Sequence, residues 1–299
     1  MTTAVSVKSR LKYIAQKEGR NVQDLFTLYV LERTLYRLSV SQYADHFTLK
    51  GGILLYGLFH EDYSRATTDI DLLGGNISND AEQIRDIFRD IFMIRQDDAI
   101  DFAMETLTVK NITEFKKYHG VNISIMAYLD RTRIPVNIDI GYGDVIIPGK
   151  QRMEYPVILE NETPILYCYS VESIIAEKFE AIVSLGKVNS RYKDFYDICE
   201  LAGHFDFDGD TLKEALAETF AHRGTKMDHI AAFEPDFADD VYRKSRWKGF
   251  LKTKHVQTDM TLEDAVLRIR ILLDPLIEAI ISGQRFDYTW HSAGQEWRK

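Results

Sequence analysis

Hydrophobic residues recur along the chain with two different spacings, which predict helices toward both ends and strands between them. Helical spacing of three and four residues runs through residues 6–38, with a break near Gly19, and returns over residues 84–91 after a polar stretch. Alternation with a period of two predicts strands at 105–109, 121–127 and 133–140. We expect these strands to pair in an antiparallel or mixed sheet.

Beyond residue 165 the helical spacing returns and continues to the end of the chain. Ser170 can cap a helix over residues 171–185, a second helix begins at Arg191, and a third lies near residues 212–222. An irregular span then precedes a long helix from about residue 261 to 282. The pattern therefore predicts an α+β protein with an amino-terminal domain at 1–165 and a mainly helical carboxy-terminal domain at 166–299.

The first candidate site is an Asp-x-Asp motif formed by Asp69 and Asp71. Successive side chains of a strand point to opposite faces, so these two carboxylates lie on the same face. Like charges at that spacing repel each other, and a divalent ion that prefers oxygen ligands would neutralise them, which suits Mg²⁺ best. The alternative is a solvated strand edge without a metal.

Two further features extend this candidate site. Gly51 and Gly52 precede an apolar run, Ile53 to Phe59, that can begin a helix, and glycine lets the backbone approach a phosphate there. Asp139 lies among apolar neighbours in the last predicted strand, where an unpaired carboxylate would be costly. It is either a third ligand for the same cation or a strand-end residue that faces water.

The carboxy-terminal half contains charged residues with two possible interpretations. Lys178 falls inside the apolar stripe of its predicted helix, where it either extends to solvent or presents an ammonium group to a triphosphate. Arg191 and Asp194 share a helix face, which usually means an ion pair.

A basic segment interleaves positive charge with Trp247 and Phe250, a combination that suits a nucleic-acid backbone and stacked bases. Its alternative is a solvated surface whose aromatic side chains pack inward. The basic residues are Arg243, Lys244, Arg246, Lys248, Lys252 and Lys254.

Composition narrows the class of protein. The 299 residues carry a formal charge of −9, which argues against a general nucleic-acid coat protein. The only cysteines are Cys168 and Cys199, which suits a reducing cytosol. Residues 1–10 lack the core of a signal peptide, and no apolar run reaches the roughly twenty residues of a membrane span, so we expect a cytoplasmic protein. Zinc and serine-hydrolase motifs are absent from the sequence.

Taken together, these motifs resemble the AbiEii/AbiGii toxin family of nucleotidyltransferases, which belongs to the DNA polymerase beta-like superfamily. The resemblance is carried, in order, by Leu31-Glu32-Arg33 through Arg37-Leu38-Ser39, Leu49-Lys50-Gly51-Gly52, Arg65 to Leu72, Glu177-Lys178-Phe179-Glu180-Ala181, and Arg191-Tyr192-Lys193-Asp194-Phe195-Tyr196-Asp197-Ile198. One departure is that the superfamily's Gly-Ser turn is Gly-Gly here, with sixteen residues before the first aspartate.

The resemblance implies a fold, a reaction and a set of roles. The fold would be a nucleotidyltransferase-type mixed sheet flanked by helices, with a helical carboxy-terminal domain and the nucleotide in a cleft between the two. Gly51, Gly52, Asp69 and Asp71 would form the nucleotide and metal site, with Asp139 as the third carboxylate. Thr67 would be a hydroxyl beside the metal site, and Lys178 and Asp194 would be the downstream lysine and aspartate that the family needs for activity. We add Arg65 and Arg191 as nucleotide-binding candidates.

The activity that the resemblance implies is transfer of a nucleotide from an NTP, with Mg²⁺ or Mn²⁺ as cofactor, by the toxin of a toxin-antitoxin or phage-defence system. Relatives of this kind look like enzymes that add pyrimidine nucleotides to tRNA acceptor ends and so block translation. A tRNA or other RNA acceptor and an antitoxin encoded alongside are therefore the expected partners. Two alternatives remain: a protein or small-molecule acceptor, and a non-catalytic module that only binds a nucleotide or a partner.

Overall fold

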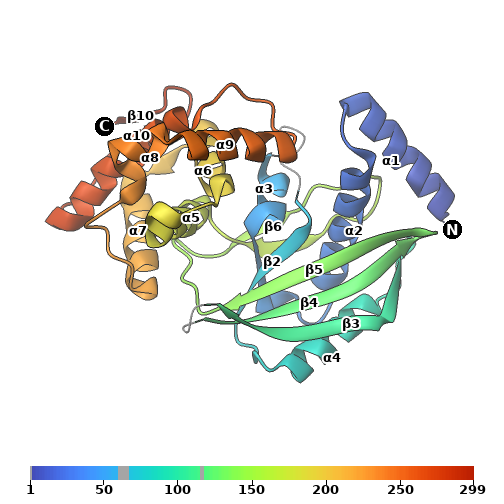
Figure 1. Cartoon of the computed structure of the whole chain (residues 1–299). Coiled ribbons are helices and arrows are strands. Elements are labelled where there is room, and N and C mark those ends of the chain that lie inside the picture. Colours follow the sequence, from blue (N-terminus) through green and yellow to red (C-terminus); the bar gives the residue numbers. More distant parts are fainter. Residues whose placement is uncertain (1, 60–66, 115–117) are drawn as a thin grey trace. The chain divides into compact units, whose positions relative to one another are not determined.

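The protein is described by a computed structural model that covers residues 2–59, 67–114 and 118–299. Its chain forms two compact units (Figure 1). Unit 1 contains Met1–Gly143 and Gln151–Cys168, and unit 2 contains Asp144–Lys150 and Tyr169–Lys299. The chain therefore passes between the units three times.

Unit 1 is built on a seven-stranded mixed sheet with the strand order β3-β4-β5-β2-β1-β7-β6. The pairs β2–β5 and β1–β7 are parallel, and the other neighbours are antiparallel. This confirms the mixed sheet that the sequence predicts. The strands are β1 (Phe47–Lys50), β2 (Asp69–Gly74), β3 (Asp101–Glu114), β4 (Tyr118–Leu129), β5 (Thr132–Tyr142), β6 (Gln151–Glu154) and β7 (Ile165–Cys168).

The helices of unit 1 are α1 (Ala4–Glu18), α2 (Val22–Ser39), α3 (Gly51–Phe59) and α4 (Ala81–Phe92). Helices α2 and α4 pack on one face of the sheet, where the rings of Phe47 and Phe88 lie 5.5 Å apart. The strand residues on that face are apolar and buried, among them Val121, Ile138 and Leu72. The opposite face carries polar residues, so the sheet has one apolar face that packs against helices and one polar face.

The sequence located the main elements of unit 1 but missed the short ones. The break at Gly19 is confirmed, because this residue ends α1 in the left-handed conformation. The three predicted strands are present and extend beyond the predicted ends. Strands β1, β6 and β7 were not predicted, because four residues give too little alternation for a period to be recognised.

Unit 2 is mainly helical. Its helices are α5 (Val171–Leu185), α6 (Tyr192–His204), α7 (Gly209–Arg223), α8 (Pro235–Asp239), α9 (Val241–Thr253) and α10 (Leu262–Ser282), and a small sheet contains β8 (Phe207–Asp208), β9 (Thr289–His291) and β10 (Glu296–Arg298). Ser170 caps α5 as predicted, through a hydrogen bond to the amide of Ser173. Among the described residues, none of the helices has both the length and the apolar character needed to cross a membrane.

The span between α7 and α10 is not irregular as predicted, because it contains the helices α8 and α9. Only Trp247 is buried along the whole of α9, so that helix has no apolar stripe by which its sequence could be recognised. The indole of Trp247 donates a hydrogen bond of 2.8 Å to the carbonyl of Met260. Tertiary contacts at one residue therefore fix a helix that the hydrophobic pattern does not reveal.

A buried ionic network anchors α2 within unit 1. Glu32 pairs with Arg33 at 2.7 Å and accepts a hydrogen bond of 2.6 Å from the amide of Ile158. One turn further on, the guanidinium of Arg37 makes a bidentate pair with Asp98 at 2.5 and 3.1 Å. Burial outweighs the neighbouring arginine and raises the pKa of Glu32 from 4.5 to about 7.

This raised pKa predicts a loss of stability with rising pH. Between about pH 4.5 and pH 7, unfolded Glu32 releases its proton before the folded side chain does, so the free energy of unfolding falls as pH rises through this window. Glu32→Gln removes the titrating group and should flatten that part of the curve in urea unfolding at pH 5, 6, 7 and 8. Glu160→Gln, at a side chain that is 95% exposed, is the control and should keep the wild-type slope. Equal slopes for wild type and Glu32→Gln would contradict the prediction.

Candidate metal and nucleotide site

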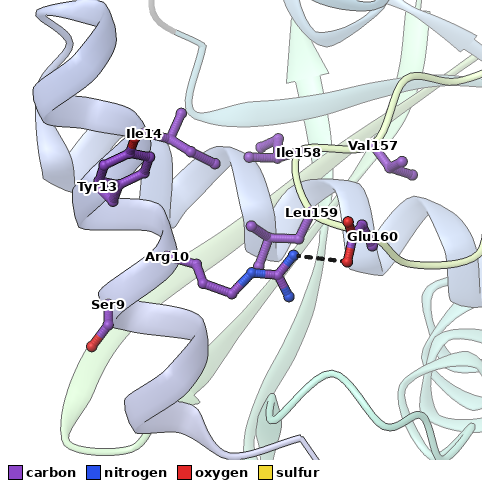
Figure 2. Close-up of a pocket in the computed structure, with 8 residues that line it drawn as sticks. All are labelled: Ser9, Arg10, Tyr13, Ile14, Val157, Ile158, Leu159 and Glu160. Carbon is purple, nitrogen blue, oxygen red and sulfur yellow. Dashed lines mark hydrogen bonds and ion pairs between the residues drawn. The ribbon is translucent and has the colours of Figure 1, made fainter.

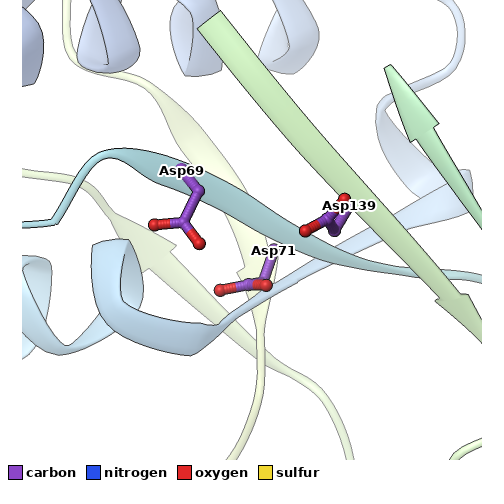
Figure 3. A group of neighbouring side chains, drawn as sticks. All are labelled: Asp69, Asp71 and Asp139. Carbon is purple, nitrogen blue, oxygen red and sulfur yellow. The ribbon is translucent and has the colours of Figure 1, made fainter. Parts of the chain in front are cut away.

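Three carboxylates converge on the polar face of the sheet in unit 1 (Figure 3). Asp69 and Asp71 project from β2, and Asp139 projects from the neighbouring strand β5. One oxygen of each lies within 4.8 Å of the others, and all three side chains are half-buried. The structure therefore brings together the three acidic residues that the sequence singled out.

Strand register explains why these carboxylates meet. In the parallel pair β2–β5, Asp71 lies opposite Asp139 and Asp69 lies opposite Asn137. Residues that face each other across a ladder share one face of the sheet. The residues between them, such as Ile70 and Ile138, are buried on the other face, so a shift of one position would expose the core. The apolar core thus fixes the register of the acidic residues.

Hydrogen bonds orient Asp139 and Asp69. The amide Nδ2 of Asn122 on β4 donates to Asp139 Oδ1 at 2.7 Å. Asp69 Oδ1 accepts from the hydroxyl of Thr67 at 3.5 Å and from the backbone amide of Thr68 at 3.3 Å. Sequence reasoning missed Asn122, although a polar amide between Val121 and Ile123 in a predicted strand was an available signal.

The donor set fits a divalent cation. Three carboxylate oxygens on adjacent strands offer only hard oxygen ligands, which is the chemistry that Mg²⁺ and Mn²⁺ share. Without a cation, three negative charges so close together repel one another, whereas a bound ion would turn this repulsion into attraction. We therefore assign Asp69, Asp71 and Asp139 as the residues that can hold a metal.

The glycine turn lies directly beside this group. Gly51 follows β1 with φ of +72° and begins α3, and a Cβ at this position would lie 2.5 Å from the Asp71 Cγ and closer still to its Oδ2. Glycine is therefore needed at position 51 for two reasons, its backbone conformation and the space that Asp71 occupies. Gly52, the next residue of α3, places a second backbone amide at the start of the same helix.

In unit 2, Lys178 does not extend into solvent. Its ammonium group lies 2.6 Å from Asp197 Oδ2 and 3.3 Å from Asp194 Oδ1, and its side chain is 11% exposed. The other oxygen of Asp194 accepts from Arg191 Nε at 2.6 Å. Both carboxylates are fully buried, so they can hold the two cations but cannot themselves reach a ligand in solvent.

Asp197 is a second residue of this network that sequence reasoning missed. It follows Asp194 by one helical turn on α6, between Tyr196 and Ile198, and that spacing was the available signal. The predicted ion pair of Arg191 with Asp194 is present. In this pair Asp194 is fully buried, whereas the side chain of Arg191 is 49% exposed.

The basic segment lies on the helix α9 and at its end, and of the two aromatic residues that it interleaves, Trp247 is buried and Phe250 is half-buried. Trp247 is 2% exposed and its ring packs against Tyr192 and Phe250. Of the two interpretations of this segment, inward packing of the aromatic side chains therefore holds for Trp247, and its buried ring is not available for base stacking.

The charges of α9 fall into two groups. Arg243 donates to the carbonyl of Lys187 and lies over the Phe237 ring, and Lys244 forms ion pairs with Asp239 and Glu263. The exposed cations on this helix are Arg246, Lys248 and Lys252, and Lys254 at its end is half-buried.

A separate concavity in unit 1, of about 640 Å³, lies between α1 and the loop 157–160 (Figure 2). Its walls include Tyr13, Ile14 and Leu159, and Arg10 and Glu160 form an ion pair of 3.5 Å at its side. None of the three aspartates lines it. Arg65, which the sequence also proposed for the site, lies outside the described residues.

The fold is similar to that of known proteins. The crystal structure of JHP933 from Helicobacter pylori superposes with a TM-score of 0.50 and 15% sequence identity, covering 87% of this chain and 94% of that one. A protein from H. pylori that is assigned as a nucleotidyltransferase gives a TM-score of 0.48 and 14% identity, covering 87% and 98%. No curated protein matches the chain. The first of these structures shows that the chain shares its overall α+β fold with a solved protein.

The sequence profile of the family described as nucleotidyl transferase AbiEii toxin, type IV toxin-antitoxin system, matches residues 33–268. The match spans most of the chain, including the glycine turn, the three aspartates, Lys178 and α9. The chain belongs to this AbiEii family, as its motifs predicted. Membership implies an NTP substrate and an antitoxin partner.

The contact between Gly51 and Asp71 gives a prediction for metal binding. Gly51→Ala forces a Cβ into the Asp71 carboxylate, so Mn²⁺ binding measured by calorimetry should weaken by about tenfold or more. Gly19→Ala is a matched control, because φ is +65° there and no atom lies within 4 Å of the added Cβ. Both changes should cost about 1–2 kcal/mol of stability from backbone strain, and only Gly51→Ala should affect the metal. Equal Mn²⁺ affinity in the two variants would contradict the assignment.

Proposed function

We propose that this protein transfers a nucleotide from an NTP to a hydroxyl at the 3′ end of an RNA, with the tRNA acceptor end as the preferred acceptor. The observation that carries the proposal is the convergence of Asp69, Asp71 and Asp139 within 4.8 Å beside the Gly51 turn. Phosphoryl and nucleotidyl transfer depend mainly on positioning and charge neutralisation, and this arrangement serves both.

In the proposed reaction, the acceptor oxygen forms a bond to the α-phosphorus of the NTP. The bond from that phosphorus to the bridging oxygen breaks, and pyrophosphate leaves with the electron pair. The acceptor proton passes to a carboxylate or to water, with Asp139 placed either to accept it or to complete the metal site. A bound Mg²⁺ would neutralise the charge of the phosphate oxygens. The backbone amides of Gly51 and Gly52 would contact the phosphates.

Further roles are proposed for residues outside the carboxylate group. Lys178 would bind the triphosphate, and Asp194 would act through Lys178 and Arg191 by holding both cations. Thr67 would orient Asp69 through the hydroxyl contact described above. Arg65 would neutralise charge on the departing pyrophosphate.

The proposal of an RNA acceptor is supported by the exposed cations of α9 and by the membership in a toxin family. A nucleotide added to the tRNA acceptor end would block aminoacylation, and the toxin would in this way stop translation. A protein or small-molecule acceptor would need no basic helix. A non-catalytic binding role would leave no reason for three carboxylates to be kept together at the cost of their repulsion.

Asp69→Ala should abolish the incorporation of labelled nucleotide into total RNA while leaving the thermal unfolding temperature within a few degrees of wild type. The physical reason is the loss of a proposed metal ligand on the polar face of the sheet, which leaves the buried apolar face of β2 unchanged. The measurement incubates the protein with each labelled NTP, Mg²⁺ and total RNA, and then sizes the labelled product. Asp130→Asn, at a surface carboxylate of the same unit, is the control. Incorporation by Asp69→Ala at the wild-type rate would rule out the proposed site.

A second test separates an RNA acceptor from a small molecule. The double variant Lys252→Glu with Lys254→Glu should weaken RNA modification, and the loss should depend steeply on salt because phosphate contacts release counterions. Activity should be compared between 50 and 200 mM salt. The double variant Lys12→Glu with Lys17→Glu makes the same charge change on exposed residues of α1 and should behave as wild type. An unchanged salt dependence in the α9 variant would favour the other acceptors.

A further inference from the structure

Two rows of polar side chains cross the sheet of unit 1 from the carboxylates to the edge strand β3. In the first row, Asp139 on β5 lies opposite Asn122 on β4, which lies opposite Lys110 on β3. The second row contains Asn137, Ser124 and Thr108 in the same strand order. Directly opposed residues share a face, so all six lie on the face that carries the metal-binding group.

The exposure and the charge of these rows change with distance from the carboxylates. Asn122, Ser124 and Asn137 are half-buried, and Lys110 and Thr108 at the edge are exposed. Apart from Asp139, neither row contains an acidic residue between β5 and β3. Amide and hydroxyl groups therefore come first, and a positive charge follows about 10 Å away, since neighbouring strands are spaced by about 4.8 Å.

The glycine turn determines which side of the carboxylates an acceptor can use. Gly51 follows β1, which pairs with β2 on the side opposite β5. If the phosphates of the NTP contact the glycine amides, the leaving pyrophosphate lies on the β1 side. In transfer reactions of this class the attacking and leaving oxygens are roughly in line, so the attacking hydroxyl must come from the β5 side. The polar rows occupy that side.

We propose that these two rows bind the single-stranded 3′ end of the acceptor RNA. Ser124 and Asn137 hydrogen-bond the 2′-hydroxyl of the terminal ribose, and Lys110 contacts a phosphate upstream. Stacked nucleotides advance about 3.4 Å each, so a row about 10 Å long accommodates two or three of them. This inference rests on the proposed function, and it identifies the acceptor surface and the basis for choosing RNA over DNA.

The first experiment measures binding in the absence of NTP. The probe is a fluorescently labelled, single-stranded oligoribonucleotide, titrated with the full chain in Mg²⁺ at several salt concentrations. Lys110→Glu should weaken binding by about tenfold and reduce the magnitude of the salt slope by about 0.7 or more. Arg89→Glu is the matched control: it makes the same charge reversal on α4, a helix on the opposite face of the same sheet, at a side chain that is 49% exposed.

The second experiment measures the choice of sugar. Two oligonucleotides are compared that differ only by a 2′-hydroxyl on the terminal nucleotide. Wild type should bind the ribose-ended probe about tenfold more tightly, and Ser124→Ala should lose most of this preference while binding the deoxy-ended probe as wild type does. The circular dichroism spectrum of each variant confirms that it is folded.

The outcomes separate this inference from the proposed function. Wild-type RNA binding and sugar preference in both Lys110→Glu and Ser124→Ala would overturn the acceptor surface, even if the wild-type protein labels RNA. Failure of the wild-type protein to label any RNA would overturn the proposed function instead. Weakened binding in Lys110→Glu with normal binding in Arg89→Glu, together with a lost sugar preference in Ser124→Ala, supports the inference.

Discussion

Electrostatic repulsion among three carboxylates is the constraint on which the chemistry of this structure depends. Holding Asp69, Asp71 and Asp139 within 4.8 Å of one another is unfavourable unless other interactions impose it. The apolar face of the sheet imposes it, because burial of Ile70 and Ile138 fixes the register that places the acidic residues opposite each other. The hydrogen bond from Asn122 orients Asp139. The absence of a side chain at Gly51 leaves space for the carboxylate of Asp71.

In unit 2 the buried charges attract one another, because carboxylates of the helical core pair with a lysine and an arginine. Asp194 and Asp197 are fully buried, and their ion pairs with Lys178 and Arg191 offset the cost of burying these charges. The carboxylates restrict the lysine and the arginine to one geometry, so in the proposed function less conformational entropy would be lost when the triphosphate binds. The role proposed for Asp194 is therefore to position these two cations and not to contact the reacting atoms.

Individual residues mark where prediction from the sequence was possible. Asp69 and Asp71 were predictable because a period of two depends only on local backbone geometry. Asn122 was not predicted, because its role depends on the pairing of β4 with β5, a contact between residues distant in sequence. For Trp247 the sequence left an exposed ring and an inward-packed ring as alternatives, and packing against Tyr192 decided between them. The helix α9 that contains Trp247 also lacks an apolar stripe from which the sequence could predict a helix.

The sequence by itself determined the family, the α+β class, the long helices and strands, and the residue types able to bind a metal and phosphates. These follow from local periodicity and from an ordered set of motifs. Only the tertiary structure decided the strand order, the partners of Lys178, the need for glycine at position 51, and the two polar rows that cross the sheet from β5 to β3. The physical reason is that these features arise from contacts between segments that are distant in the sequence. Burial of apolar residues selects these contacts, and local periodicity does not reveal them.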